Sequence, residues 1–189
     1  GRRPESYSNF SEKIDTVGQP FVSHETGQWC VFPDFTEIKK YTGVMKARNF
    51  ELFQEDLNDR GMGDQAQDFL MASGKLQTLS YKHEIERTLR TPGYAGFQLL
   101  ALNDYSGQGT ALVGLLNAFW EEKGYINAEE FRKFCAPTVL LAKMERFIFK
   151  NNEAFKAAIE ISHFGQDILK NQQTEWSVKD QFGKLIATG

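Results

Sequence analysis

The sequence predicts an α/β fold over most of its length, followed by a shorter stretch of antiparallel strands. Two apolar runs, at 20–25 and 97–102, each end in polar and glycine residues, as buried strands do where they enter a loop. A long helical pattern separates the two runs, and a period of two begins after about residue 143. Strand, helix and strand form a βαβ unit, whose strands run parallel.

Two helices are predicted between these strands. Residues 49–58 carry a helical pattern that is capped by Asn49. Residues 64–90 carry the strongest helical pattern of the chain, which Pro92 stops. The charge-rich end of this helix, residues 82–90, is expected to be a solvated face. The apolar stripe that indicates this helix comprises Phe69, Leu70, Leu76, Leu79, Ile85 and Leu89.

Composition excludes several classes of function. Lysine and arginine total 22 against 25 for aspartate and glutamate, so the net charge is −3 and a nucleic-acid partner is not expected. The apolar fraction of 41% and the aromatic fraction of 13% predict a packed core. No apolar run approaches the ~20 residues that cross a bilayer, so no membrane partner is expected. Cys30 and Cys135 are expected to be buried free thiols.

The most informative polar cluster follows the first strand, where residues 24–29 read HETGQW. A carboxylate such as Glu25 can act as a nucleophile on a sugar, and an indole such as Trp29 can pack on pyranose C–H groups. This pattern therefore indicates sugar chemistry. The alternative is a strand-end glutamate that pairs with a cation, beside a tryptophan that fills the core.

A second polar cluster follows the second strand at residues 103–110. Its carboxylate, amide and hydroxyl groups can hold sugar hydroxyls, because they supply both donors and acceptors. The residues concerned are Asn103, Asp104, Tyr105 and Gln108. The alternative is a solvated turn, in which the side chains bond to their own backbone.

No cofactor and no metal are expected. The glycines after the second strand lack the Gly-x-Gly-x-x-Gly spacing of a dinucleotide site. The histidines, at positions 24, 83 and 163, are widely separated, which does not support a metal site. No Gly-x-Ser-x-Gly motif indicates a serine nucleophile.

Short strands are predicted in the last part of the chain, at 147–149, 155–161, 174–179 and 184–187. Turn residues separate them, which is typical of an antiparallel sandwich.

Residues 20–29 and 96–104 resemble the seventh and eighth strands of retaining (β/α)8-barrel glycoside hydrolases of the family 2 type. The resemblance implies that residues 1–145 are the C-terminal portion of such a barrel, with its last βα units and a long helix. It also implies that residues 146–189 begin an incomplete antiparallel immunoglobulin-like β-sandwich.

The resemblance implies that Glu25 is the nucleophile of a β-galactosidase-like or β-glucuronidase-like enzyme. Substrate-binding residues would be His24, Gln28, Trp29, Asn103, Asp104, Tyr105 and Gln108. The acid/base glutamate of the family lies on the fourth barrel strand, which has no counterpart here, so the isolated chain is expected to be inactive. Thr26 stands where the family usually has tyrosine, and leucines stand where its eighth strand commonly has tryptophan.

Other functions remain open at this point. A non-catalytic carbohydrate-binding or interaction module would use the same aromatic and amide residues, and a helical scaffold would use none of them. The expected partner is a carbohydrate, in polysaccharide degradation in the periplasm or outside the cell. Two parallel strands alone leave open edges, so we also expect self-association or contact with upstream domains.

Overall fold

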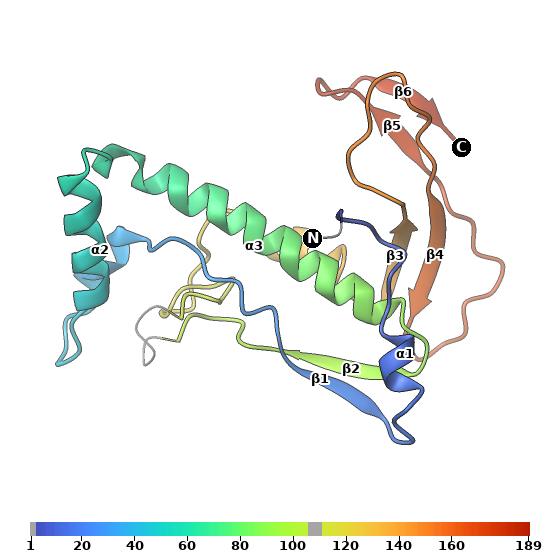
Figure 1. Ribbon diagram of the computed structural model, residues 1–189, viewed down its shortest axis with the longest axis horizontal. Coiled ribbons are helices and arrows are strands. Elements are labelled where there is room, and N and C mark those ends of the chain that lie inside the picture. The colour runs from blue at the N-terminus through green and yellow to red at the C-terminus, as the bar shows by residue number, and fades with distance from the viewer. Residues whose placement is uncertain (1–2, 106–110) are drawn as a thin grey trace.

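The central unit of the fold consists of two parallel strands and a long helix that packs beside them (Figure 1). The structure is a computed structural model that describes residues 3–105 and 111–189. β1 spans Phe21–Thr26, α3 spans Ala66–Leu89 and β2 spans Tyr94–Leu99. The chain is therefore a mixed α/β protein, and the predicted parallel βαβ unit is confirmed.

β2 begins earlier than the apolar pattern predicts. The ladder pairs Tyr94 with Phe21 and ends where Leu99 lies opposite Thr26, so the predicted strand at 97–102 is displaced. Gly93, with a φ of +77°, lets the chain turn directly after α3. The second predicted polar cluster therefore begins some residues beyond the end of the strand.

The buried face of α3 differs from the predicted apolar stripe. Tyr81 and Ile85 are buried, together with the polar side chain of Gln77. Leu76 and Leu79, which belong to the predicted apolar stripe, are 65% and 62% exposed. The face of α3 that packs on the core includes Gln77, which a search for apolar residues alone does not detect.

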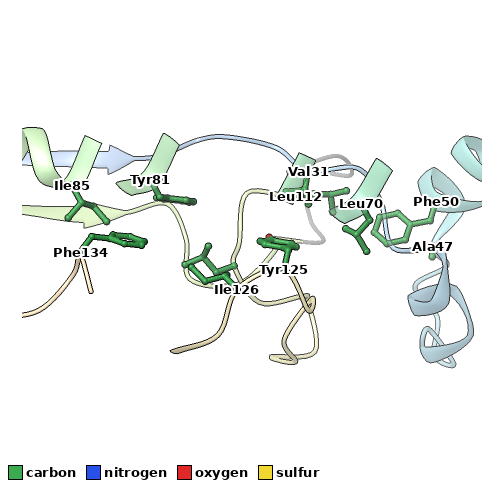
Figure 2. Close-up of a cluster of buried hydrophobic side chains, with 11 residues drawn as sticks. Val31, Ala47, Phe50, Leu70, Tyr81, Ile85, Leu112, Tyr125, Ile126 and Phe134 are labelled. Carbon is green, nitrogen blue, oxygen red and sulfur yellow. The ribbon is translucent and has the colours of Figure 1, made fainter. Parts of the chain in front are cut away.

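The hydrophobic core lies along this face of α3 (Figure 2). It is closed by α2 (Arg48–Asp59), which confirms the predicted helix at 49–58, and by residues on either side of α4 (Ala128–Arg132). The core consists of Val31, Ala47, Phe50, Leu70, Tyr81, Ile85, Leu112, Leu115, Tyr125, Ile126 and Phe134. The loops after β1 and β2 thus take part in the core.

Shorter helical segments complete this part of the chain. They are α1 (Ser11–Ile14), η1 (Phe35–Lys40) and η2 (Gly63–Gln65). Across residues 3–105 and 111–189, no helix is both long enough and apolar enough to cross a membrane.

The C-terminal strands form two separate antiparallel ladders. β3 (Thr138–Lys143) pairs with β4 (Ala158–His163), and β5 (Ser177–Lys179) pairs with β6 (Leu185–Thr188). The antiparallel pairing is as predicted. The predicted strand at 147–149 is not formed, and β3 precedes the region where strands were expected.

The β3–β4 ladder crosses the predicted domain boundary at residue 145 and is attached to the core. The Ser162 hydroxyl donates to the Leu89 carbonyl oxygen at the end of α3, at 3.1 Å. The Ser6 hydroxyl donates to the Ala142 carbonyl oxygen in β3 at 2.7 Å. Figure 1 shows β5 and β6 further from the central unit than β3.

Both cysteines are free, as predicted, but their burial differs. Cys30 is exposed, which corrects the expectation that it is buried, because its neighbour Val31 takes the core position. Cys135 is half-buried, and burial raises the pKa of its thiol.

Candidate functional site

Glu25 lies near the end of β1, where the chain turns sharply. Its φ is +56°, and Gly27 follows with a φ of +85°. A left-handed backbone costs a residue other than glycine about 1–3 kcal/mol, and such strain gathers at functional sites. The Trp29 N–H donates to the Gly27 carbonyl oxygen at 2.7 Å and closes the turn. One tight loop thus carries both Glu25 and Trp29.

The carboxylate of Glu25 is partly exposed and is held by its neighbours in the loop. Gln28 Nε2 donates to Glu25 Oε2 at 2.6 Å, and His24 Nδ1 lies 3.6 Å from Glu25 Oε1. The Glu25 side chain is 43% exposed and that of His24 is 76% exposed. Neither of these partners is a buried lysine or arginine. The carboxylate faces solvent, and the Gln28 amide donates to Oε2 and not to Oε1.

A cavity of about 580 Å³ opens beside Glu25. This volume falls within the range of small-molecule sites, roughly 300–1,000 Å³. One wall is the end of β1 and the following loop, and the other is the carboxyl-terminal half of α3. The lining residues are Phe10, Ser23, Glu25, Thr26, Gly27, Gln28, Trp29, His83, Glu84, Arg87 and Thr88. Trp29 is 47% exposed, so part of its indole is available to a ligand.

Two buried side chains of α3 fix the loop that carries Glu25. Gln77 Nε2 donates to the carbonyl oxygen of Trp29 at 2.6 Å and to that of Val113 at 2.9 Å. The ring of Tyr81 fills the space beside Gly27, where a Cβ atom would lie 2.0 Å from the ring. Gln77 therefore joins the loop after β1 to the segment after β2, and only glycine fits at position 27.

Glu84 places a second carboxyl group in the cavity. Glu84 lines the cavity together with Gly27 and Trp29 of the loop. Burial raises the pKa of the Glu84 carboxyl, although the nearby Trp29 and Gly27 N–H groups and the Arg87 cation act in the opposite direction.

The cavity wall on α3 corrects the expectation that residues 82–90 form a solvated face. His83, Glu84 and Arg87 are half-buried, and Arg90 is buried. A sequence signal for this wall is the spacing of polar residues on the buried face, since Gln77 and Glu84 are two helical turns apart. A search for apolar residues alone does not detect this spacing of polar residues.

Asn103, Asp104 and Tyr105, which were expected to bind sugar, do not line this cavity. Asp104 is buried, with its Oδ2 2.7 Å from Lys123 Nζ, and both side chains are 2% exposed. The Gly114 N–H donates to Asp104 Oδ1 at 2.9 Å. Asn103 is half-buried and Tyr105 is 57% exposed. The structure therefore brings Gln28 and Trp29 to Glu25, and uses Asp104 inside the protein.

Gln108 lies outside the described residues. Within the parts of the chain that the structure describes, no group of three or more His, Cys, Asp or Glu side chains is placed to hold a metal ion.

A buried charged cluster joins the loops after the two strands. Glu37 is 2% exposed and its Oε2 has no hydrogen-bond partner among the described residues. Burial, and then repulsion by Asp104, raise the pKa of Glu37 to about 7. Burial also raises the pKa of Asp104 and lowers that of Lys123, while the attraction between the two opposes both shifts.

Comparison with known proteins concerns only the C-terminal strands. A family model described as a domain of unknown function (DUF8488) matches residues 153–189. No curated protein matches the chain. Since residues 153–189 contain β4, β5 and β6, the similarity to this family lies outside the cavity beside Glu25.

Proposed function

We propose that this chain is the C-terminal part of a retaining glycoside hydrolase in which Glu25 is the nucleophile. The observation that carries the proposal is the accessible carboxylate of Glu25 near the end of a parallel strand, in a cavity shared with Trp29. Sites in parallel α/β folds lie at the carboxyl ends of the strands. A carboxylate can act as the nucleophile of sugar cleavage, and an aromatic face beside it can pack on the sugar ring.

Glu25 would supply the oxygen that attacks the anomeric carbon. The Gln28 amide occupies Oε2, which leaves Oε1 for the attack. The attack forms an ester between Oε1 and the sugar, while a second carboxyl group protonates the leaving oxygen. Water activated by that second group then hydrolyses the ester, which frees Glu25 with net retention at the anomeric carbon. The resemblance to family 2 enzymes assigns the second group to another barrel strand.

In this proposal β1 and β2 are the last two strands of a (β/α)8 barrel, and β3–β6 begin an immunoglobulin-like sandwich. Parallel pairing across a long helix supports the first part. Within the described residues β1 and β2 pair only with each other, so each strand has an edge on which a further barrel strand fits. The expected substrates are β-galactosides or β-glucuronides of extracellular glycans.

The test is Glu25→Gln in a longer protein that includes the upstream barrel strands. We expect hydrolysis of p-nitrophenyl β-D-galactopyranoside or of the corresponding glucuronide to fall by about 10³-fold or more, with an unchanged circular dichroism spectrum. Glu175→Gln makes the same chemical change before β5, away from the cavity, and should keep the activity.

Covalent trapping gives a direct control on the role of Glu25. A 2-deoxy-2-fluoro glycosyl fluoride should add one fluorosugar to the peptide that contains Glu25, as measured by mass spectrometry. Full activity of Glu25→Gln would refute the nucleophile. Binding of the glycoside without hydrolysis by any form would favour a carbohydrate-binding module.

A further inference from the structure

A second cavity lies where the N-terminal segment meets the connection between β3 and β4. Its volume is about 570 Å³, within the range of roughly 300–1,000 Å³ that small-molecule sites have. It shares no lining residue with the cavity beside Glu25. The lining residues with a charge or a large apolar side chain are Arg3, Arg146, Phe147, Ile148, Lys150 and Glu153.

Positive charge predominates in this cavity, although the chain as a whole has a net charge of −3. The lining contains three cationic side chains and one carboxylate, so it has a surplus of two positive charges. Among the described residues, neither the Arg3 guanidinium nor the Lys150 ammonium has an ion-pair partner. Cations gathered without counter-charges attract an anion.

The third cation, Arg146, is held in place on two sides. Its Nη1 lies 3.2 Å from Glu153 Oε1, and its guanidinium carbon lies 4.8 Å from the centre of the Phe149 ring. Nη1 is the one Arg146 nitrogen with a hydrogen-bond partner among the described residues. The N–H groups of Nε and Nη2 are therefore available to a ligand.

The carboxylate of Glu153 is occupied by the same loop. Its Oε2 accepts from the Lys150 N–H at 2.7 Å, and the Glu153 N–H donates to the Lys150 carbonyl oxygen at 3.1 Å. The Lys150 N–H is also the main cause that holds the pKa of Glu153 below its ordinary value. These contacts fix the loop before a ligand binds, which lowers the entropy cost of binding.

The N-terminal segment is fixed beside this loop at Ser6, which is buried. The Ser6 N–H donates to the Met144 carbonyl oxygen at 2.9 Å, and the Met144 N–H donates to the Ser6 hydroxyl oxygen at 2.7 Å. Arg3 precedes this anchor by three residues and so lies at the cavity. Glu5 supplies no counter-charge to the lining, because its carboxylate accepts from two backbone N–H groups of its own segment.

Apolar side chains form another part of the lining. Phe147 is 46% exposed and Ile148 is 83% exposed. The Phe147 ring packs edge-on against His83 of α3, with the ring centroids 6.1 Å apart. A ligand that covers these side chains removes apolar surface from water. The cavity therefore combines an anion site with an apolar wall.

We propose that this cavity binds a phosphate monoester whose other end is an apolar group such as an aromatic ring. A phosphate monoester carries a charge of about −1.5 to −2 at pH 7, which matches the surplus of two positive charges in the lining. The planar guanidinium of arginine can donate two parallel hydrogen bonds to phosphate oxygens. The site is separate from the proposed glycosidase function, and neither proposal depends on the other.

Phenyl phosphate is the probe, titrated into the 15N-labelled chain at pH 7 and about 0.15 M salt. We expect the amide resonances of Arg146, Lys150 and Glu153 to shift until they saturate, while that of Gly27, in the cavity beside Glu25, stays in place. Phenol and inorganic phosphate each carry one half of the probe and should bind at least about tenfold more weakly. Equally tight binding of inorganic phosphate would overturn the assignment of an apolar ester.

Three substitutions of single cations measure the contribution of charge. Arg146→Gln should weaken the binding of phenyl phosphate by about tenfold, because charge-assisted hydrogen bonds are lost. Lys150→Gln should weaken it by about threefold, because this ammonium is exposed. Lys156→Gln is the matched control, since Lys156 is exposed on the same loop but does not line the cavity. Equal effects of Lys150→Gln and Lys156→Gln would show unspecific attraction and overturn the inference.

Glu153→Gln separates a binding role from a structural one. It removes the carboxylate of the lining and keeps an oxygen that can accept from the Lys150 N–H. It should strengthen the binding of phenyl phosphate by about threefold, whereas a disrupted loop would weaken it. If Arg146→Gln fails to fold, Arg146→Lys replaces it and should still weaken binding, because lysine lacks the planar fork. Weaker binding by a folded Glu153→Gln overturns the inference.

A phosphate monoester can be a soluble molecule or the headgroup of a lipid. Vesicles of phosphatidylcholine that contain phosphatidate distinguish these sources. Sedimentation of the chain with such vesicles, abolished by Arg146→Gln, would identify the lipid headgroup. Binding of phenyl phosphate without sedimentation would identify a soluble ester, and the absence of both would overturn the inference.

Discussion

Residues 20–143 and residues 147–189 both contain apolar side chains, but they bury them to very different extents. In the first region Ile85 on α3 is 0% exposed. In the second region Ser162 is the one buried residue, and Ile186 in β6 is 65% exposed. The two regions therefore differ in the packing of their side chains more than in their content of apolar residues.

A second layer accounts for this difference. A two-stranded ladder satisfies backbone hydrogen bonds, as β5 and β6 do where the Trp176 N–H donates to the Gly189 carbonyl oxygen at 2.8 Å. Such a ladder alone buries little apolar surface and is marginally stable. Around β1 and β2, α3 and the following loops supply the facing layer that forms a core.

The largest effect on the free energy of unfolding is expected from the loss of one charge of a buried ion pair. Asp104→Asn leaves the ammonium of Lys123, which is 2% exposed, without its counter-charge. We expect the free energy of unfolding to fall by about 4 kcal/mol in urea titrations at pH 7.

The control is a more exposed ion pair between β3 and β4. Lys143 pairs with Glu160 at 2.7 Å between β3 and β4, and the side chain of Glu160 is 44% exposed. Glu160→Gln should change the free energy of unfolding by no more than about 0.5 kcal/mol. Equal effects of the two substitutions would show that burial does not separate the regions.

A smaller effect is expected for two glycines with nearly the same backbone. Gly27 and Gly183 have φ values of +85° and +82°. A Cβ at position 27 would lie 2.0 Å from the Tyr81 ring, whereas nothing lies within 4 Å of a Cβ at position 183. Gly27→Ala should therefore cost about 3 kcal/mol, and Gly183→Ala about 1 kcal/mol.

Thermal unfolding followed by circular dichroism at 222 nm measures both glycine variants, because α3 dominates that signal. Gly27→Ala should lower Tm clearly, while Gly183→Ala should lower it only slightly. A larger loss for Gly183→Ala would mean that the β5–β6 ladder is coupled to the core more tightly than its exposure indicates.

The smallest of the three main effects is the pH dependence of the cluster around Glu37. Its pKa is about 7 in the folded chain against 4.5 as the ordinary value, so the folded state keeps a proton that the unfolded state has lost between these pH values. The stability that depends on this proton is full below about pH 4.5 and is lost as pH rises through 7.

We expect this loss to be about 2 kcal/mol, since a shift of this size corresponds to at most about 3 kcal/mol before the site relaxes. Glu37→Gln cannot ionise, so the difference in stability between it and the parent chain should grow in its favour from pH 5 to pH 8. Urea titrations at several pH values measure this difference, and a constant difference would contradict the assignment.

Some of the candidate site could be predicted from the sequence, because it lies within one loop. Glu25, Gln28 and Trp29 are close in the chain, so a strand that ends near Glu25 brings them together. Asp104 was expected beside them, but its partner Lys123 is supplied by a distant segment. Glu84 was missed, because its place in the cavity depends on which face of α3 packs against that loop.

The sequence by itself determined α2, α3 and β1, and the parallel unit that α3 forms with β1 and β2. Helical and strand periods follow from the local geometry of the backbone, so they can be recognised from neighbouring residues. Only the tertiary structure decided which face of α3 is buried, where β2 begins, and that Glu84 lines a cavity with Trp29 while Asp104 pairs with Lys123. These contacts join residues far apart in the chain, and their free energy depends on packing and burial that no local pattern encodes.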